Sequence, residues 1–196
     1  MNILVLDRDG VINVDSEDYI RTPEQWVPIP GSLDAIARLC RAEYRVVVVT
    51  NQSGIGRGLF DIHTLNKIHA RMLDQVRHKG GEIDAIFFCP HHPDAGCACR
   101  KPKPGMLKDL ALRLKISLTG VPVIGDSLRD IEAAVAVNAL PILVKTGYRR
   151  VSEAELAQTG QAHGTRVLTF DDLAGFSDAL LAGDVDQHIR SSDAPR

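Results

Sequence analysis

Residues 3–10, ILVLDRDG, decide the fold of this 196-residue chain. The four aliphatic residues predict a short strand buried on both faces, and the acidic pair marks its carboxyl end. Because side chains alternate along a strand, we expect Asp7 and Asp9 to project to the same side. Two adjacent carboxylates repel each other, and Mg²⁺, which prefers oxygen ligands, is the natural counter-ion. The alternative is an acidic turn, because Asp-Gly is also a common hairpin signal.

Further along the chain, short aliphatic runs alternate with longer amphipathic segments. The runs predict strands over residues 46–49, 83–88, 121–124 and 142–144. The amphipathic segments predict a helix capped by Ser32, a second capped by Asp61, and three more over residues 105–115, 128–137 and 171–181. Strands buried on both faces and separated by helices predict an α/β fold: a Rossmann-like, mostly parallel sheet with helices on both faces.

The composition is that of a globular protein, with 44% hydrophobic and 24% charged residues. Lys plus Arg (23) nearly balances Asp plus Glu (25), which argues against a nucleic-acid partner. No apolar run approaches the ~18 residues of a membrane span, and the apolar start is too short for a signal peptide. We therefore expect a cytoplasmic, monomeric protein with no membrane partner.

The periodicity also predicts the domain organisation. One domain is expected over residues 1–182, followed by a mobile tail over residues 183–196, where the apolar pattern is lost. Two long connections, residues 10–31 and 89–104, are too short for a second domain, so any cap over a site is minimal. In an open parallel sheet, ligands bind beyond the carboxyl ends of the strands, so polar residues at those ends are the candidates for function.

The second predicted strand ends in the polar run Thr50-Asn51-Gln52-Ser53. Its hydroxyls and amides, together with free backbone N–H groups, suit phosphate oxygens. The alternative is a hydrogen-bonded turn. The glycines at positions 54, 56 and 58 lack the G-x-G-x-x-G spacing of dinucleotide-binding loops, and we interpret them as a flexible loop.

The fourth predicted strand ends at Asp126. If this strand lies beside the first, Asp126 completes a magnesium site with Asp7. Asp130, one helical turn further, then orders a metal-bound water or a lysine; alternatively, it only stabilises a helix N-terminus. Upstream, Lys101 or Lys103 can place a positive charge against a phosphate, and Arg100 can bind one with a bidentate fork. The alternative there is a solvated basic linker.

Three of the four cysteines, Cys89, Cys97 and Cys99, lie within eleven residues of one another, together with His91. In a reducing compartment such a cluster indicates a metal site more often than disulfides. Three thiolates and one imidazole make a closed tetrahedral zinc site, which has no open position for catalysis. We expect structural zinc that holds the loop and orients the basic residues after it.

These motifs together resemble those of a known superfamily. D-x-D-G at residues 7–10, Thr50, Lys101 and G-D-x-x-x-D at residues 125–130 are similar to the four motifs of the haloacid dehalogenase (HAD) phosphatases. Three further motifs narrow the resemblance to the heptose 1,7-bisphosphate phosphatases within this superfamily. They follow one another along the chain up to residue 102 and read V-V-T-N-Q-S-G, C-P-H-H and C-x-C-R-K-P. Histidinol-phosphate phosphatases share much of this pattern. The resemblance covers about residues 1–180, and the zinc loop is shorter than in many members.

The resemblance implies a role for each carboxylate. Asp7 is the implied nucleophile on phosphorus, and an aspartyl-phosphate forms and is then hydrolysed. Asp9 is the implied general acid and base, which protonates the departing sugar oxygen and then activates water. Magnesium is implied to be bound by the carboxylates of Asp7 and Asp126 and by the backbone carbonyl of Asp9.

It also implies the residues that bind substrate. Thr50 and Lys101 hold the nonbridging phosphate oxygens, and Asp130 supports the site. Arg100 contacts the remainder of a sugar phosphate. Further substrate contacts are expected from two segments: Asp15, Ser16, Glu17 and Asp18 in the first loop, and Asn51, Gln52 and Ser53 after the second strand.

The implied activity is magnesium-dependent hydrolysis of the 7-phosphate of a heptose 1,7-bisphosphate, giving heptose 1-phosphate for ADP- or GDP-heptose synthesis of the lipopolysaccharide type. The expected partner is thus a small sugar bisphosphate. Hydrolysis of histidinol phosphate is an alternative of the same class. An alternative of another class is a non-catalytic interaction module that keeps the fold and the zinc loop.

Overall fold

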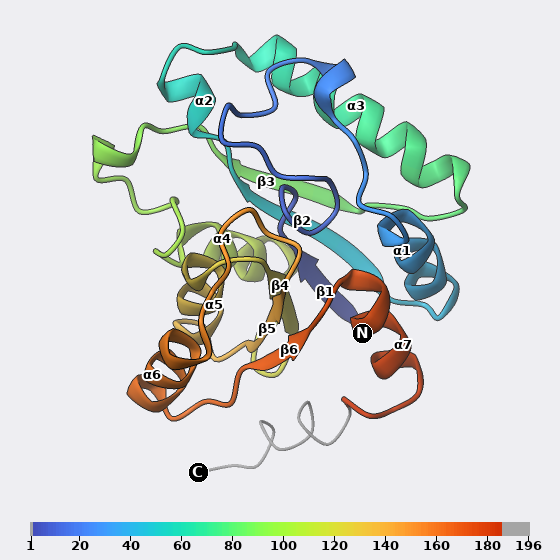
Figure 1. Ribbon diagram of the computed structural model, residues 1–196, viewed down its shortest axis with the longest axis vertical. Helices are drawn as coiled ribbons and strands as arrows, with labels where there is room; N and C mark the ends of the chain where they lie inside the picture. The colour runs from blue at the N-terminus through green and yellow to red at the C-terminus, as the bar shows by residue number, and fades with distance from the viewer. Residues whose placement is uncertain (1, 186–196) are drawn as a thin grey trace.

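The computed structural model describes residues 2–185 and consists of one six-stranded sheet with helices on both faces (Figure 1). The strand order is β3-β2-β1-β4-β5-β6, and every neighbouring pair is parallel. The strands are β1 (Ile3–Leu6), β2 (Arg45–Asn51), β3 (Ala85–Cys89), β4 (Pro122–Gly125), β5 (Leu140–Val144) and β6 (Leu168–Phe170). The predicted α/β class is confirmed. The last strand was not predicted, because only Leu168 of its three residues is buried.

One or two helices follow each strand along the chain. They are α1 (Ser32–Arg41), α2 (Ser53–Gly56), α3 (Ile62–His78), α4 (Gly105–Leu114), α5 (Leu128–Val135), α6 (Glu153–His163) and α7 (Leu173–Leu181). The two long connections contain only single 3-10 turns, η1 (Pro23–Gln25) and η2 (Pro93–Ala95), so the cap is minimal as predicted. None of the helices in residues 2–185 combines the length and apolarity needed to cross a bilayer.

Two predicted helix caps had different outcomes. Asp61 caps α3 as predicted, because its side chain accepts a hydrogen bond from the backbone N–H of Thr64. The Ser32 prediction is wrong: Gly31, in a left-handed conformation, is the N-cap of α1, and the Ser32 hydroxyl instead donates to the carbonyl of Ile12. That bond ties the first loop to α1.

Helix α6 was not predicted, although its start carries a recognisable signal. Ser152 and Glu155 form a capping box, in which each side chain bonds the other residue's backbone N–H. Its apolar periodicity is weak, and the helix packs mainly against α5. A helix that has a capping box but no clear apolar stripe is hard to predict from hydrophobic periodicity alone.

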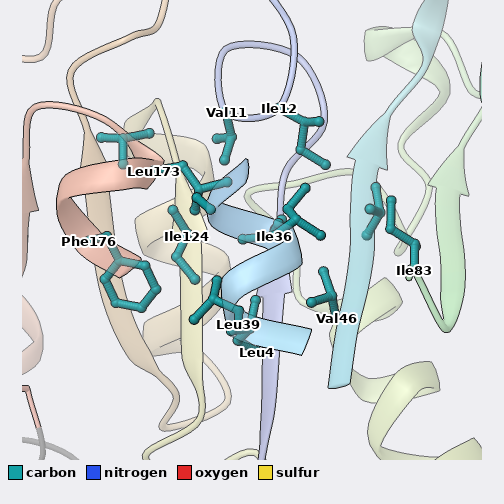
Figure 2. Close-up of a cluster of buried hydrophobic side chains, with 14 of the residues drawn as sticks. Leu4, Val11, Ile12, Ile36, Leu39, Val46, Ile83, Ile124, Leu173 and Phe176 are labelled. Atoms are coloured by element: carbon teal, nitrogen blue, oxygen red, sulfur yellow. The ribbon is translucent and has the colours of Figure 1, made fainter. Parts of the chain in front are cut away.

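The sheet has one apolar cluster on each face because residues alternate along the strands. Leu4 of β1, Val46 of β2 and Ile124 of β4 face α1, α3 and α7, where Ile36 and Phe176 pack against them (Figure 2). The intervening strand residues face α4 and α5 on the other side. The two clusters hold the strands in register, so their carboxyl ends meet at one edge.

The first loop is held down by apolar side chains that enter the core. Val11, Ile12 and Trp26 have no exposed surface, and Figure 2 shows Val11 and Ile12 above the cluster on α1. The loop residues between Ile12 and Trp26 are thereby kept at the carboxyl edge of the sheet.

Two of the three glycines after β2 lie in a helix and not in the loop we expected, whereas Gly58 lies in the turn that follows, with a φ of +69°. Gly54 and Gly56 belong to the short helix α2. A Cβ atom on Gly56 would lie 2.3 Å from the backbone nitrogen of His92, so glycine is required there by the close approach of the cysteine-rich loop.

At the C-terminal end, Val185 lies in the segment expected to be a tail, but it is buried in the main core cluster. The rest of that predicted tail, residues 186–196, lies outside the described residues.

Candidate active site

The carboxyl ends of β1, β2 and β4 surround a cavity of about 840 Å³. Strand β1 pairs with β2 on one side and β4 on the other, which brings Asp7, Thr50 and Asp126 together. The neighbouring position of β1 and β4 was the condition for Asp126 to join Asp7, and the structure meets it.

Three carboxylates form the acidic end of this cavity. Asp7, Asp126 and Asp130 each offer an oxygen, and these oxygens lie within 4.8 Å of one another. Asp126 is closely packed, because a Cβ on Gly10 would lie 2.3 Å from its Oδ2 atom. The glycine of the D-x-D-G motif therefore makes room for a carboxylate from another strand.

Lys101 is the cation inside this cluster. Its Nζ lies 2.8 Å from Asp7 Oδ2 and 2.5 Å from Asp130 Oδ1, and donates to the carbonyl of Val49 at 2.9 Å. The residue is only 5% exposed. Lys103, the alternative in the sequence, is turned away and donates to the carbonyl of Gly96.

The backbone around Lys101 is fixed by the end of β2. Asn51 Nδ2 donates to the carbonyl of Lys101, and the N–H of Lys101 donates to Asn51 Oδ1, both at 3.1 Å. We expected Asn51 to bind substrate. In the structure, Asn51 lines the cavity, and its amide also holds the backbone of Lys101.

One lysine does not balance three buried acids. Burial, together with the charge of Asp130, raises the pKa of Asp126 to about 9. Burial also raises the pKa of Asp7 to about 7, even though Lys101 opposes this shift. Only Asp130 has a pKa below its ordinary value, because Lys101 outweighs the effect of burial.

These shifts provide a test of whether a divalent cation fits. A cation between Asp7 and Asp126 would stabilise both in their ionised forms, and carboxylate oxygens are the ligands that Mg²⁺ prefers. The donor set is therefore suited to Mg²⁺. Asp130 is committed to Lys101 and to the Ser127 hydroxyl, so it is the least available of the three carboxylates as a ligand.

Asp9 lines the same cavity but belongs to a separate network. Its carboxylate is paired with Arg8, the residue between the two acids of the motif. Although burial acts in the opposite direction, Arg8 and two amide side chains keep the pKa of Asp9 below its ordinary value.

Of the polar run after β2, Thr50, Gln52 and Ser53 are all buried and all line the cavity. Gln52 Nε2 donates to Thr50 Oγ1 and to Asp9 Oδ2, at 3.0 and 2.9 Å. Ser53 begins α2. The run is thus a hydrogen-bonded unit within the wall of the cavity.

The first loop contributes three of its four predicted residues. Asp15, Ser16 and Glu17 line the cavity. Asp18 is absent from the lining; its side chain is 95% exposed and lies 3.9 Å from Arg21.

Arg100, which we expected to contact substrate, lines the cavity together with other basic residues that the sequence motifs did not identify. Its Nη1 atom is buried without a hydrogen-bond partner among the described residues. Burial and the positive charge of Arg129, which lines the same cavity, both lower the pKa of Arg100. The cavity lining includes further basic side chains from separate segments: Arg57, Arg129, Arg149 and Arg150. We call these four, with Arg100, the arginine rim.

The cysteine cluster forms a second candidate metal centre. Ligand atoms of Cys89, His91, Cys97 and Cys99 all lie within 4.8 Å of one another. The sulfur atoms are 3.2–3.6 Å apart, and His91 Nδ1 lies 3.2 Å from Cys99 Sγ. Tetrahedral zinc with Zn–S bonds of ~2.3 Å would separate the sulfurs by about 3.8 Å. All four cysteines are free thiols, so the geometry and donor set fit zinc.

The thiols of the cluster differ in the direction of their pKa shifts. Burial and the neighbouring Cys99 raise the pKa of Cys89 to about 12. The pKa of Cys97 falls to about 7 despite some burial, because the N–H of Arg100 and the neighbouring thiols donate to its sulfur. Three thiolates so close together require a compensating positive charge.

Two protein families match this chain and define its class. Residues 2–127 match the polynucleotide kinase 3 phosphatase family, and residues 98–174 match the HAD-hydrolase-like family. The Rossmann-like sheet and its acidic carboxyl edge therefore define a phosphatase of the HAD superfamily.

The more similar proteins identify the family. D-glycero-beta-D-manno-heptose-1,7-bisphosphate 7-phosphatase from Bordetella bronchiseptica is 52% identical over 181 residues, covering 92% of this chain and 98% of the relative. The protein of that name from Pseudomonas putida is 53% identical over 182 residues, covering 92% and 100%. This chain belongs to the D-glycero-beta-D-manno-heptose-1,7-bisphosphate 7-phosphatase family.

Solved structures agree with this assignment. The crystal structure of the B. bronchiseptica D,D-heptose 1,7-bisphosphate phosphatase, complexed with magnesium and phosphate, has a TM-score of 0.85 and covers 93% of this chain and 99% of that one. The Burkholderia thailandensis phosphatase is 44% identical, with a TM-score of 0.67 over 93% of this chain and 99% of that one.

Proposed function

We propose that this phosphatase hydrolyses the 7-phosphate of D-glycero-D-manno-heptose 1,7-bisphosphate, with Mg²⁺ as its cofactor. The observation that carries the proposal is the convergence of Asp7, Asp126 and Asp130 around the buried Lys101 at the carboxyl edge of the sheet. The names and substrates of the similar proteins support the choice of substrate.

In the first chemical step, an oxygen of Asp7 attacks phosphorus. The bond between phosphorus and the sugar oxygen breaks, and Asp9 gives that oxygen a proton, which Asp9 takes up from solvent when the negatively charged phosphate binds beside it. The phosphoryl group is then held as an acyl phosphate on Asp7. In the second step Asp9 takes a proton from water, the water oxygen attacks phosphorus, and Asp7 is released with inorganic phosphate.

The charge that develops on the phosphoryl oxygens needs fixed donors. Lys101 Nζ is in place for this, since it already contacts Asp7, and the Thr50 hydroxyl lines the same wall. Asp130 keeps Lys101 charged and in position. Burial alone would lower the pKa of the lysine, but the charges of Asp130 and Asp7 outweigh burial, so the pKa lies above its ordinary value.

The residues proposed to hold Mg²⁺ are Asp7 and Asp126 through their carboxylates and Asp9 through its backbone carbonyl. When bound, the ion neutralises charge on the phosphate and on the two acids.

The arginine rim supports a substrate with two phosphates. The acidic end of the cavity, with Mg²⁺, would receive the phosphate that is cleaved. Arg100 and Arg129 lie on the same cavity and offer bidentate donors to the second phosphate. Asp15, Ser16 and Glu17 offer acceptors for sugar hydroxyls between the two ends.

Zinc in the cysteine cluster is proposed to be structural. All four ligand positions are filled by protein, and the last ligand, Cys99, directly precedes Arg100 and Lys101. The metal would fix the loop from which both basic side chains extend.

Residues 1–182 are proposed to act as one phosphatase domain, monomeric and cytoplasmic, in nucleotide-activated heptose synthesis of the lipopolysaccharide type.

The test is steady-state kinetics of the purified protein with Mg²⁺ on both anomers of heptose 1,7-bisphosphate and on histidinol phosphate. We expect the highest kcat/KM on a heptose bisphosphate, with phosphate released from position 7. Faster turnover of histidinol phosphate would overturn the substrate, and activity unaffected by Asp7→Asn would overturn the mechanism.

A further inference from the structure

Arg8 occupies an unusual position for a charged residue. It lies between the two acids of the first motif and is 1% exposed, although it lines neither metal site. A buried guanidinium is costly where its donors are unpaired, and Arg8 Nη1 has no hydrogen-bond partner among the described residues, so a hydrophobic residue would pack there at less cost. The partners of Arg8 therefore indicate what it is for.

Arg8 binds Asp9 as a two-pronged fork. Its Nε donates to Asp9 Oδ1 at 3.0 Å, and its Nη2 donates to Oδ2 at 2.8 Å. Such a bidentate pair fixes the plane of the carboxylate as well as its distance. Lysine has one nitrogen and no plane, so it cannot replace this geometry.

Two amide side chains also donate hydrogen bonds to the Asp9 carboxylate. Asn13 Nδ2 donates to Asp9 Oδ1 at 2.9 Å, and Gln52 Nε2 donates to Asp9 Oδ2 at 2.9 Å. Asn13 is itself anchored by a bond to the carbonyl of Val14. Asp9 thus accepts four hydrogen bonds, two on each oxygen, from three side chains that are all at least 95% buried.

Gln52 also connects this carboxylate to the second strand. Its Oε1 accepts from Arg8 Nη2 at 3.1 Å, while its Nε2 donates to Thr50 Oγ1 at 3.0 Å. The network therefore sets the place of Asp9 relative to the end of β2, where the phosphate is proposed to be held. The Asp9 side chain is nevertheless 20% exposed toward the cavity.

We infer that Arg8, Gln52 and Asn13 are positioning residues that hold the Asp9 carboxylate in line with the leaving oxygen of the substrate. This inference rests on the proposed role of Asp9 as general acid and base. Proton transfer requires heavy atoms within hydrogen-bond reach, and a displacement of about 1 Å can cost about 100-fold in rate.

The leaving group of the substrate distinguishes positioning from a purely structural role. A sugar alkoxide needs a proton as it departs, whereas p-nitrophenolate departs as a stable anion without one. Loss of Asp9 alignment should therefore slow the first step, transfer of the phosphoryl group to Asp7, selectively for the sugar substrate, whereas the second step, in which Asp9 activates water, is common to both substrates. General damage to the fold, to Mg²⁺ binding or to Thr50 would slow both substrates together.

The experiment compares Arg8→Lys and Gln52→Met on heptose 1,7-bisphosphate and p-nitrophenyl phosphate, with Asp9→Asn as the reference. Arg8→Lys keeps the charge and does not touch Thr50; Gln52→Met keeps the volume and is the milder change if Arg8→Lys folds poorly. Gln75→Met on α3 is the matched control. Circular dichroism and thermal unfolding verify that each variant is folded.

For both variants we expect the single-turnover rate of phosphoryl transfer from the heptose substrate, measured with enzyme in excess, to fall about 10- to 100-fold, with KM changed less than about 3-fold. On p-nitrophenyl phosphate, the rate of the first-turnover burst of p-nitrophenolate should fall less than about 3-fold for Arg8→Lys. For Gln52→Met, which also loses the bond to Thr50, the burst rate should fall less than the rate on the heptose substrate. Combining Gln52→Met with Asp9→Asn should add little to Asp9→Asn alone.

Equal losses of the first-step rate on both substrates, or no loss on either, would overturn the positioning role while leaving the proposed function intact. A wild-type protein that is inactive on both substrates, or an Asp7→Asn variant as active as wild type, would overturn the proposed function and this inference with it.

Discussion

Lys101 is the residue on which the charge balance of the site depends. It lies among three acids from two strand ends and one helix, and its contacts to Asp7 and Asp130 are both within 2.8 Å. A buried charge that loses its partner is far more costly than an exposed one. The same contact therefore serves stability and the proposed chemistry.

Replacing this lysine should affect both properties. Lys101→Met leaves buried carboxylates uncompensated, and we expect the free energy of unfolding of the metal-free protein to fall by about 3–5 kcal/mol. We also expect kcat/KM to fall at least about 100-fold, because a fixed donor to the phosphate is lost. Urea unfolding and steady-state kinetics measure the two effects. Lys103→Met is the control and should change neither by more than about 0.5 kcal/mol or 2-fold.

His69, on α3, should make stability depend on pH. Burial, aided by the positive charge of Arg8, lowers its pKa to about 3 in the folded state, whereas an unfolded histidine titrates near 6.5. As pH falls below about 6.5, the unfolded chain gains a proton that the folded chain does not. This histidine then reduces the free energy of unfolding by up to about 1.4 kcal/mol per pH unit, until about pH 3.

The measurement is urea unfolding between pH 6.5 and 4.5 for wild type and His69→Leu. The variant should lose stability less steeply with falling pH, and His63→Leu, at an exposed position of the same helix, should follow wild type. Parallel pH profiles for wild type and His69→Leu would contradict the buried neutral state.

At the scale of elements, the segment from Cys89 to Pro104 has almost no regular structure, only the single turn η2. It nevertheless ends in two residues of the site, Arg100 and Lys101. Three thiols and an imidazole within 4.8 Å give it the cross-link that backbone hydrogen bonds would otherwise provide. Contact of Gly56 with the backbone of His92 also fixes the loop against α2.

Removing one ligand should therefore loosen this loop. For Cys97→Ser we expect zinc content to fall well below one ion per chain, and Tm to fall by about 4–8 °C, equivalent to about 2 kcal/mol. Activity should fall as well, through misplacement of Arg100 and Lys101. Cys40→Ser is the control, since that thiol bonds Glu82 outside the cluster. Zinc-free protein with unchanged Tm and full activity would refute the structural role.

On the scale of the whole molecule, the sheet places like charges together. Strands β1 and β4 are over a hundred residues apart in sequence, yet their pairing brings Asp126 within 4.8 Å of Asp7. Burial of several acids at one edge destabilises the metal-free fold, and a bound cation relieves this. Stability and metal binding are thus linked through the sheet.

This linkage predicts that one substitution, Asp126→Asn, affects metal-free stability and stabilisation by Mg²⁺ differently. Mg²⁺ at 100 times its dissociation constant should stabilise wild type by about 2.7 kcal/mol. Asp126→Asn should leave metal-free stability unchanged or higher, because one like charge is gone, and should abolish the stabilisation by Mg²⁺ together with activity. Thermal unfolding with and without Mg²⁺ tests this; an Mg²⁺ response equal to wild type would exclude Asp126 as a ligand.

The sequence alone determined those features that depend on neighbouring residues. Aliphatic runs ending in acids or hydroxyls identified β1, β2 and β4 and their functional ends, because strand burial and side-chain alternation are local properties. The Cys/His cluster was predictable for the same reason, since Cys89, His91, Cys97 and Cys99 lie within eleven residues of one another.

Only the tertiary structure decided which of these groups meet. The choice of Lys101 over Lys103, the use of Asn51 to hold the lysine backbone, and the exclusion of Asp18 from the cavity depend on how loops pack. The fork from Arg8 to Asp9 and the arginine rim likewise join side chains whose meeting no local pattern encodes. The physical reason is that strand order and loop closure set distances between residues far apart in the chain, whereas periodicity reports only on the immediate surroundings of each residue.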